Sequence, residues 1–467
     1  MPLPIEEWSP PMTSKQILHC VIGAVLVTAS TAQAVPAFAR QSGMNCAACH
    51  TVFPELTPFG RQFKAGGYTL TTTKQLTEGG LDGARVSLEL PSTMPVGVMV
   101  TTGFTHTASA QQVGGTSTAQ NDDLSLPQQF SVFFAGKVAP KLGAFVQLTY
   151  SGPAGTIGFD MTDIRFAHQT EMAGGPLILG ATLNNSPTVT DLWNSTPAWG
   201  TPFIASASAP TPAAGTLIEG KLAQNVAGAG LYAFWNGMVY AEFNLYRSAP
   251  LGVSLPLDAT TGATNVIQTV MPYWRVAAEK AFGNNTLSLG TFGLHGVLLP
   301  GGQYTDNSSG VPTLATHPLM PPGDAYTDVG FDTQFQHLGA KHIVTAVVTY
   351  IYEGQILAAS NAFGNSSNST NELHSFKASA SYIYDRLVGG RFTFSTMRGS
   401  SDPTFYGGEP RSTSLAGEVF TTPWQNVKVG LQYLAYLDFN GRAQNYDGNG
   451  RNAAQNNSLY VYLWLAF

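Results

Sequence analysis

The chain has 467 residues, a net charge of −6 and only 11% charged residues, yet only 43% of it is hydrophobic. Its acidity argues against a nucleic-acid partner, and its 26 Phe and 18 Tyr argue against disorder. Beyond an apolar stretch near the start, no run of about 18 apolar residues occurs, so no transmembrane helix is predicted. These limits leave an all-β protein, either soluble or embedded in a membrane.

Residues 1–34 are predicted to be a secretory signal peptide. Met12 and Lys15 open a short basic region, a mostly apolar stretch follows, and "AQA" then offers the small residues of a cleavage site. Because residues 1–11 are acidic and rich in proline, we expect the true start to be Met12. Cys20 lies inside the apolar stretch, so we expect it to be removed with the signal.

The next feature is "MNCAACHTVF" (44–53), which holds both remaining cysteines, Cys46 and Cys49, followed by His50. Two thiols at this spacing can add to the two vinyl groups of a haem, and the adjacent imidazole then becomes an axial iron ligand. The alternatives are a redox dithiol, which expects a βαβ pattern, and half of a zinc site, which needs a second ligand pair. Neither accompanies the motif. We therefore predict one covalent haem c on Cys46 and Cys49, with His50 as proximal ligand.

Residues 35–95 are predicted to form a monohaem cytochrome c segment. A segment of this size buries little core alone, so we expect it inside or against a barrel whose lumen completes the enclosure. Within it, "PELTPFGRQF" is predicted to be a short helix with Leu56, Phe59 and Phe63 on one apolar face. That face packs either on the haem edge or on a small hydrophobic anchor unrelated to haem.

Three cations of this segment are candidate partners for the haem propionates: Arg40, Arg61 and Lys64. The alternative for each of them is a solvated surface position. Their nearness in sequence to the haem motif is what singles them out.

The first predicted strand suggests a sixth iron ligand. In "VGVMVTTGF" (96–104), the alternation points three valines and Phe104 outward and leaves Met99 facing the lumen among glycines and threonines. Met99 is the predicted distal ligand, and a thioether there raises the haem potential relative to a second imidazole. Met94, just before the strand, is the alternative. The competing interpretation of Met99 is packing on the segment inside the barrel.

From residue 96 to residue 467 the chain is predicted to form an outer-membrane β-barrel of sixteen antiparallel strands. Apolar residues alternate with polar ones, as one face meets lipid and the other a polar lumen. The links between strands alternate, with exceptions, between tight turns and long loops, and the even count returns both termini to the periplasmic side. The strands are expected near 96–107, 127–138, 142–152, 157–169, 176–186, 226–235, 238–247, 271–282, 284–298, 324–337, 342–354, 371–384, 386–398, 411–421, 426–437 and 456–467.

The last predicted strand, "SLYVYLWLAF", ends in Phe467. A terminal aromatic residue on a strand resembles the assembly signal of bacterial outer-membrane barrels. A soluble β-sandwich shows similar alternation but does not readily explain this ending. We therefore favour a barrel in outer-membrane lipid.

Two stretches together resemble a known family. "FARQSGMNCAACHTVFPELTPFGRQFKAGGY" (38–68), followed by an outer-membrane-type barrel, is similar to the cytochrome–porin fusion family of iron-oxidising bacteria, and so is "DLWNSTPAWGTPF" (191–203). The resemblance implies a single haem c at the N-terminus of a sixteen-stranded porin. It also implies a function that composition does not show. Electrons would pass from extracellular Fe(II) to a periplasmic cytochrome or copper carrier, as in an iron(II):cytochrome c oxidoreductase.

Two other functions remain open on the residues alone. The first is a solute-transporting porin with a structural or gating haem, in which lumen residues such as Lys377, Ser379 and Ser381 would select solutes. The second is a surface haem sensor or adhesin. Conductance in a planar bilayer would favour the porin, and reduction of the haem by Fe(II) on intact cells would favour electron transfer.

Overall fold

We describe a computed structural model, which defines residues 37–70, 75–78, 88–111, 122–196, 202–248, 266–299, 305–306, 313–314 and 323–467. The chain divides between Ala34 and Val35, and all described residues belong to the second unit. The predicted signal peptide, with Met12 and Cys20, lies outside the described residues. Within the described ranges, no helix is both long enough and apolar enough to cross a membrane.

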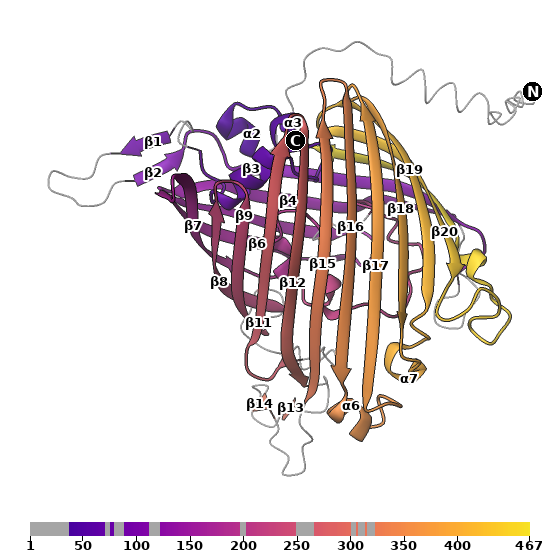
Figure 1. The fold of residues 1–467 in the computed structure, drawn as a ribbon. Helices are drawn as coiled ribbons and strands as arrows, with labels where there is room; N and C mark the ends of the chain where they lie inside the picture. Colours follow the sequence, from indigo (N-terminus) through magenta and orange to yellow (C-terminus); the bar gives the residue numbers. More distant parts are fainter. Residues whose placement is uncertain are drawn as a thin grey trace, which may run out of the picture. The chain divides into compact units, whose positions relative to one another are not determined.

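Sixteen long antiparallel strands form a closed barrel (Figure 1). The sheet has seventeen members, of which β10 (Val266–Ile267) is a two-residue side pairing. The barrel closes because β21 pairs with β3, with Val461 opposite Phe104, and because β9 pairs with β11. The strands are β3 (Val96–Thr107), β4 (Asp122–Ala139), β5 (Leu142–Ser151), β6 (Thr156–Met172), β7 (Gly175–Asn184), β8 (Val226–Trp235), β9 (Val239–Ser248), β11 (Met271–Phe282), β12 (Asn285–Leu299), β15 (Asp324–Leu338), β16 (His342–Ile356), β17 (Thr370–Tyr384), β18 (Val388–Gly399), β19 (Ser412–Trp424), β20 (Val427–Asp438) and β21 (Ser458–Ala466).

The predicted sixteen-stranded antiparallel barrel and its strand positions are confirmed, and the haem c plug remains a prediction. The largest difference at a strand start is at β4, which begins at Asp122 rather than near residue 127. Its first residues extend the pairing with the end of β3, where His106 lies opposite Asp122. The two acidic residues that open β4 are therefore part of a strand rather than of a loop.

The short elements lie at the two ends of the barrel or in its lumen. We define the far end as the end that carries α6 (Ala358–Ala362) and α7 (Pro403–Tyr406). The near end is the opposite one, where Phe467 pairs with Val98. The other short elements are α2 (Ala37–Ser42), α3 (Cys46–Cys49), α4 (Pro58–Ala65), α5 (Pro187–Thr190), the π-turn η1 (Leu217–Lys221), the 3-10 turn η3 (Ala453–Asn456), and the strand pairs β1 (Gln75–Glu78) with β2 (Leu88–Pro91) and β13 (Thr305–Asp306) with β14 (Thr313–Leu314).

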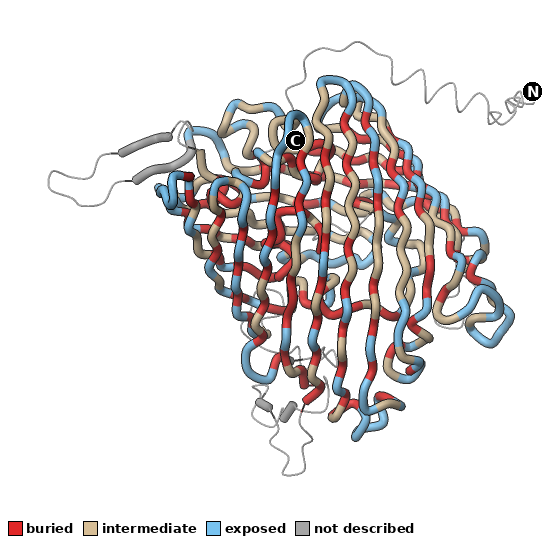
Figure 2. The backbone as a smooth tube through the Cα atoms, in the orientation of Figure 1, coloured by how far each residue is buried: buried red, intermediate tan, exposed pale blue. Residues whose placement is uncertain are grey.

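The wall is apolar outside and polar inside, which inverts the pattern of a soluble protein. On β12, Leu289 is 59% exposed while its neighbour Ser288 is 4% exposed. On β15, Phe331 is 57% exposed and Asp332 is 8% exposed. Figure 2 shows this alternation along the strands. Because side chains of a strand alternate between its faces, each strand presents large apolar groups outward and hydrogen-bonding groups to the lumen.

A long link fills the lumen instead of extending from the barrel. The strand pattern predicts that the long link 187–225 is a loop outside the wall, and the structure shows instead that it runs through the lumen. Thr349 and Gln334 donate to the backbone oxygens of Ser195 and Trp193, and Gln432 donates to that of Ile204. These donors come from three different strands, so the link crosses the lumen. We call its described part, residues 185–196 and 202–225, the lumen segment.

Buried charges anchor the lumen segment to the wall. Asp191 accepts hydrogen bonds from the backbone N–H groups of Trp193, Ser195 and Thr196. Arg275 of β11 lies between Asp191, at 3.4 Å, and Asp332 of β15, at 2.7 Å, with its guanidinium 5.0 Å from the Trp193 ring. Burial alone would raise the pKa of Asp191, but Arg275 and these hydrogen bonds outweigh it and hold the pKa below its usual value.

Candidate functional site

The two cysteines and the histidine of the motif are brought together by one turn of helix. Asn45 caps α3 by accepting a hydrogen bond from the Ala48 N–H at 3.1 Å, and the His50 N–H closes the turn on the Cys46 carbonyl at 2.9 Å. Residues three apart on a helix share a face. The thiols of Cys46 and Cys49 therefore point to the same side, with His50 directly after them.

Helix α4 packs closely on α3 and fixes its position. Thr57 caps α4 through the Gly60 N–H and also donates its hydroxyl proton to the Ala48 carbonyl at 2.8 Å. A Cβ atom added at Gly60 would lie 2.3 Å from the Cys49 carbonyl oxygen. Only glycine allows this approach, so Gly60 holds the motif against α4.

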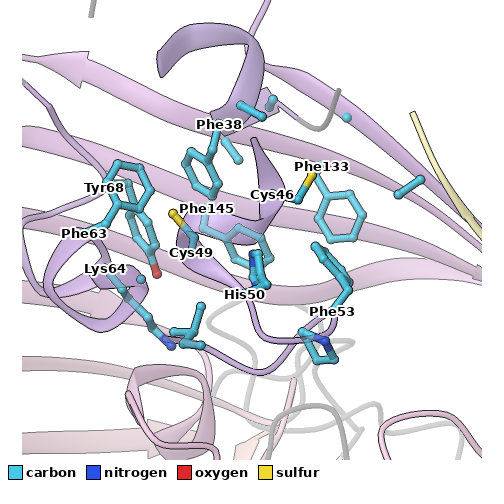
Figure 3. A pocket seen from close by; sticks show the side chains of 18 of the residues that line it. Phe38, Cys46, Cys49, His50, Phe53, Phe63, Lys64, Tyr68, Phe133 and Phe145 are labelled. Atoms are coloured by element: carbon cyan, nitrogen blue, oxygen red, sulfur yellow. The ribbon is translucent and has the colours of Figure 1, made fainter. Parts of the chain in front are cut away.

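These residues line a cavity of about 160 Å³. Figure 3 shows the two thiols and the imidazole among the rings of Phe38, Phe133 and Phe145. The walls come from residues 37–70 on one side and from lumen-facing positions of β3 to β6 on the other. The barrel therefore completes a site that the N-terminal segment cannot enclose alone.

Aromatic rings make most of the cavity wall. Phe38 stacks on Tyr68 at 5.4 Å and meets Phe63 edge-on at 5.1 Å. Phe133 and Phe145 lie 5.6 Å apart on neighbouring strands, and Phe53 lies 4.8 Å from the His50 ring. Rings in such contact exclude water and present a flat apolar surface. A planar apolar macrocycle fits this lining.

His50 is held neutral by its surroundings. Burial lowers its pKa to about 4, although the backbone of Pro54 and Glu55 and the Glu55 carboxylate oppose the shift. Its Nδ1 atom is buried and has no hydrogen-bond partner among the described residues. A neutral imidazole is the form that binds a metal.

The competing interpretations of the motif find less support. Burial raises the pKa of the Cys46 thiol and raises that of Cys49 to about 11, whereas a redox-active dithiol needs a lowered value. Over the part of the chain that the structure describes, no group of three His, Cys, Asp or Glu residues could hold a metal ion. A zinc site at the motif therefore lacks its second pair of ligands.

Met99 lies where the alternation of β3 predicts. It is 1% exposed, faces the lumen and lines the same cavity as Cys46 and His50. Met94 is 74% exposed and is not among the lining residues. Met161 of β6 lines the cavity as well, and sequence reasoning missed it. The sequence did carry a signal for it, because Met161 lies two and four residues before Asp163 and Arg165 and so shares their buried face of β6.

The three predicted propionate partners have different surroundings. Lys64 lines the cavity, and its Nζ donates to the carbonyls of Val189 and Asp191 at 2.5 and 3.0 Å. Arg61 is buried in an ion pair with Glu279 at 2.7 Å and does not line the cavity, so it anchors α4 to β11. Arg40 is exposed on α2 and does not line the cavity either.

The structure therefore defines a closed, sixteen-stranded antiparallel barrel with an apolar cavity at its near end. No protein-family model matches the chain, and no curated protein matches it. Several solved outer-membrane barrels are similar in structure. They include the channel DcaP of Acinetobacter baumannii, at 11% identity and a TM-score of 0.45, with 80% of this chain and 96% of that chain covered.

Two further solved structures show the same degree of likeness. The anion-selective porin from Comamonas acidovorans has 11% identity and a TM-score of 0.43 over 80% of this chain and 98% of that one. OmpT of Vibrio cholerae has 8% identity and a TM-score of 0.42 over 80% of this chain and 96% of that one. This likeness is one of barrel architecture and goes no further.

Proposed function

We propose that this protein is an outer-membrane barrel that holds one haem c in its near-end cavity and transfers electrons across the membrane. The observation that carries the proposal is the cavity itself. It places Cys46, Cys49 and a buried, neutral His50 on one apolar wall. A CxxCH motif, a flat aromatic lining and a buried, neutral imidazole together match the needs of a covalent haem.

The membrane location is supported by the inverted wall. Its outward face carries large exposed apolar side chains on successive strands, which in water would favour aggregation. In a bilayer the same apolar face contacts the lipid tails, and the closed barrel leaves no strand edge without hydrogen-bond partners. We place both ends of the barrel sequence, and the haem cavity beside them, on the periplasmic side, because the near end carries the tight turns.

The residues of the cavity would have different roles in holding the haem. Cys46 and Cys49 would hold the group by thioether bonds, and His50 would bind the iron. The rings of Phe38, Phe133 and Phe145 exclude water. Met99 would be the second protein ligand of the iron, and Lys64, which already donates to two carbonyls, would pair with a propionate. When bound, a haem c supplies reversible one-electron transfer.

This position is compatible with the donor and acceptor that the family resemblance implies. A group enclosed in the wall of an outer membrane lies between an external reductant and the carriers of the periplasm. The reductant proposed is extracellular Fe(II), whose ferric product is insoluble and is better formed outside the cell. The acceptor is a periplasmic cytochrome or copper carrier. The chain itself then needs no acid–base catalyst.

A second candidate function is solute transport, with the haem as a structural or gating element. The sixteen-stranded, channel-like architecture favours it. The lumen segment weighs against it, because it crosses the lumen and is hydrogen-bonded to several strands. Lys377, a predicted solute-selecting residue, is ion-paired with Glu219 of the lumen segment at 2.5 Å. Large, steady conductance of the haem-loaded protein in a planar bilayer would favour transport.

The test begins with the thiols. Cys46→Ala together with Cys49→Ala should abolish haem staining of the denatured protein, whereas Cys20→Ala, which lies in the predicted signal, should leave it intact. The wild-type protein in intact cells should then show haem reduction when Fe(II) is added outside. Full staining of the double variant would refute the haem assignment. Normal haem staining without haem reduction by Fe(II) would refute Fe(II) as the donor and leave the haem assignment standing.

A further inference from the structure

A second, polar cavity lies directly behind the apolar one. Its volume is about 200 Å³, many times the roughly 10–15 Å³ that one water molecule needs. Thr101, Gln128, Gln129 and Asp160 supply its polar lining. Two side chains, Met99 and Met161, line both cavities and form part of the wall between them.

Asp160 differs from most other lumen carboxylates in its partners. Asp163, Asp191 and Glu219 each face an arginine or lysine within 4 Å. Within the described ranges, Asp160 forms no ion pair with a lysine, arginine or histidine. Its oxygens accept hydrogen bonds from three neutral groups, which are Gln147 at 3.0 Å, Thr149 at 2.9 Å and Gln224 at 2.5 Å. Its negative charge is therefore not neutralised by a neighbouring cation.

A buried hydroxyl supplies an independent observation at the same place. Thr101 is 2% exposed and lines the polar cavity, and its Oγ1 has no hydrogen-bond partner among the described residues. A buried polar atom without a partner costs free energy unless something else in the cavity binds it. A ligand or its water shell in the cavity would satisfy this oxygen.

The polar cavity lies beside the shortest of the far-end links. The link between β5 and β6 covers only residues 152–155, whereas every other far-end link has twelve residues or more. Asp160 is four residues from the start of β6, which is about 13 Å along a strand. Asp160, Gln128 and Gln129 are half-buried rather than enclosed. Along β6, Asp160 and the polar cavity therefore lie close to the far rim.

We infer that the polar cavity binds a hydrated divalent cation, and that this is where the external donor, Fe(II), docks. Carboxylate, amide and hydroxyl oxygens bind such hard cations directly or through the water molecules that the ion carries. An ion held there by Asp160 lies behind Met99 and Met161, one layer of side chains from the apolar cavity. The inference rests on the proposed function for the identity of the donor, but the binding of a cation is independent of it.

The experiment uses the haem-loaded full chain in detergent and Mn(II) as a redox-inactive probe. Electron paramagnetic resonance should show one bound Mn(II), and Asp160→Asn should weaken its binding by about tenfold or more. Thr101→Val, which removes only the unpartnered hydroxyl, should weaken it less and should leave the fold intact. Glu372→Gln, an exposed far-end carboxylate, is the matched control and should change nothing.

Kinetics then connect the cation to the donor. In stopped flow, Asp160→Asn should slow haem reduction by Fe(II) while leaving reduction by dithionite, an anion, unchanged. Mn(II) should compete with Fe(II) in the wild type. Equal Mn(II) binding by wild type, Asp160→Asn and Thr101→Val would overturn the inference, even if Fe(II) still reduces the protein. Failure of Fe(II) to reduce the wild type, with Mn(II) bound as expected, would overturn the donor assignment and leave the cation site standing.

Discussion

The N-terminal residues 37–70 and the lumen segment both lie inside the barrel, but they are built in different ways. Residues 37–70 are anchored by single ion pairs, Glu55 with Arg391 and Arg61 with Glu279, and between these anchors they leave a cavity lined by aromatic rings. The lumen segment is held by Asp191 and Glu219, and its residues Leu217, Ile218 and Leu222 pack in a buried core against the wall. Elsewhere Val189 and Phe203 of this segment line the two cavities.

Residues 37–70 carry the side chains that would bind a ligand, whereas the lumen segment mainly fills the barrel. A cavity as large as the near-end one costs stability when empty, because its lining loses packing contacts. Its retention beside a CxxCH motif therefore points to an occupant. The lumen segment instead places a buried apolar cluster and several backbone hydrogen-bond acceptors across the lumen. The predictions below test whether the two elements are independent, in order of decreasing effect.

The largest effect is expected from Arg275→Met. This change leaves the carboxylates of Asp191 and Asp332 buried without their shared cation, which costs about 3–5 kcal/mol of folding free energy. The lumen segment should detach from β11, and the free energy of unfolding in urea should fall accordingly. If the two elements are independent, covalent haem should still be attached.

The control for Arg275 is an exposed ion pair of the same type. Arg411 pairs with Asp438 at 2.8 Å with its side chain 51% exposed, so Arg411→Gln should cost about 1 kcal/mol or less. Planar-bilayer conductance should rise in Arg275→Met and stay low in Arg411→Gln. Equal stability of the two variants would contradict the anchoring role of Arg275.

An intermediate effect is expected from Met99→Ala, which touches only the cavity. If Met99 is the distal ligand, the absorption spectrum should move away from that of a low-spin His/Met haem, and the reduction potential should fall. Met161→Ala is the matched control, because Met161 lines the same cavity from β6. A methionine-to-iron absorption band that persists in Met99→Ala and disappears in Met161→Ala would reassign the ligand to Met161.

The smallest effect is expected at the far end, from Asp402→Asn. Burial would raise the pKa of Asp402, but hydrogen bonds from Ser366, Asn371 and nearby backbone N–H groups outweigh it and lower the pKa to about 2. Because the folded pKa is depressed, this stabilisation is complete above the unfolded value of 3.8 and is lost as the pH falls through about 2.

Proteolysis at acid pH measures this contribution. Between pH 4 and pH 5, pepsin should cleave the far-end links of Asp402→Asn faster than those of the wild type, and the difference should shrink as the pH approaches 2. Asp385→Asn, at a near-end turn, should behave as the wild type. A difference that grows instead at pH 2 would show that the wild-type carboxylate is not the stabilising group.

The sequence alone determined the barrel and the haem motif. Strand alternation has a period of two and is set by local geometry, so β3 could be predicted to begin at Val96 and to point Met99 inward. The CxxCH chemistry depends on a spacing of a few residues. The tight turns and long links also followed from local composition, and the short link expected at 153–156, which the structure places at 152–155, was an exception to their alternation.

Only the tertiary structure decided what fills the lumen. A link between two strands has no local signal that separates a loop outside from a segment inside, because the choice depends on partners distant in sequence. Arg275 and Asp332 lie about 80 and 140 residues from Asp191. For the same reason Arg61 was predicted to face a propionate and instead pairs with Glu279, and Met161 became a ligand candidate only when β6 closed around the cavity. A buried charge is placed by its partner, and closing the barrel is what brings those partners together.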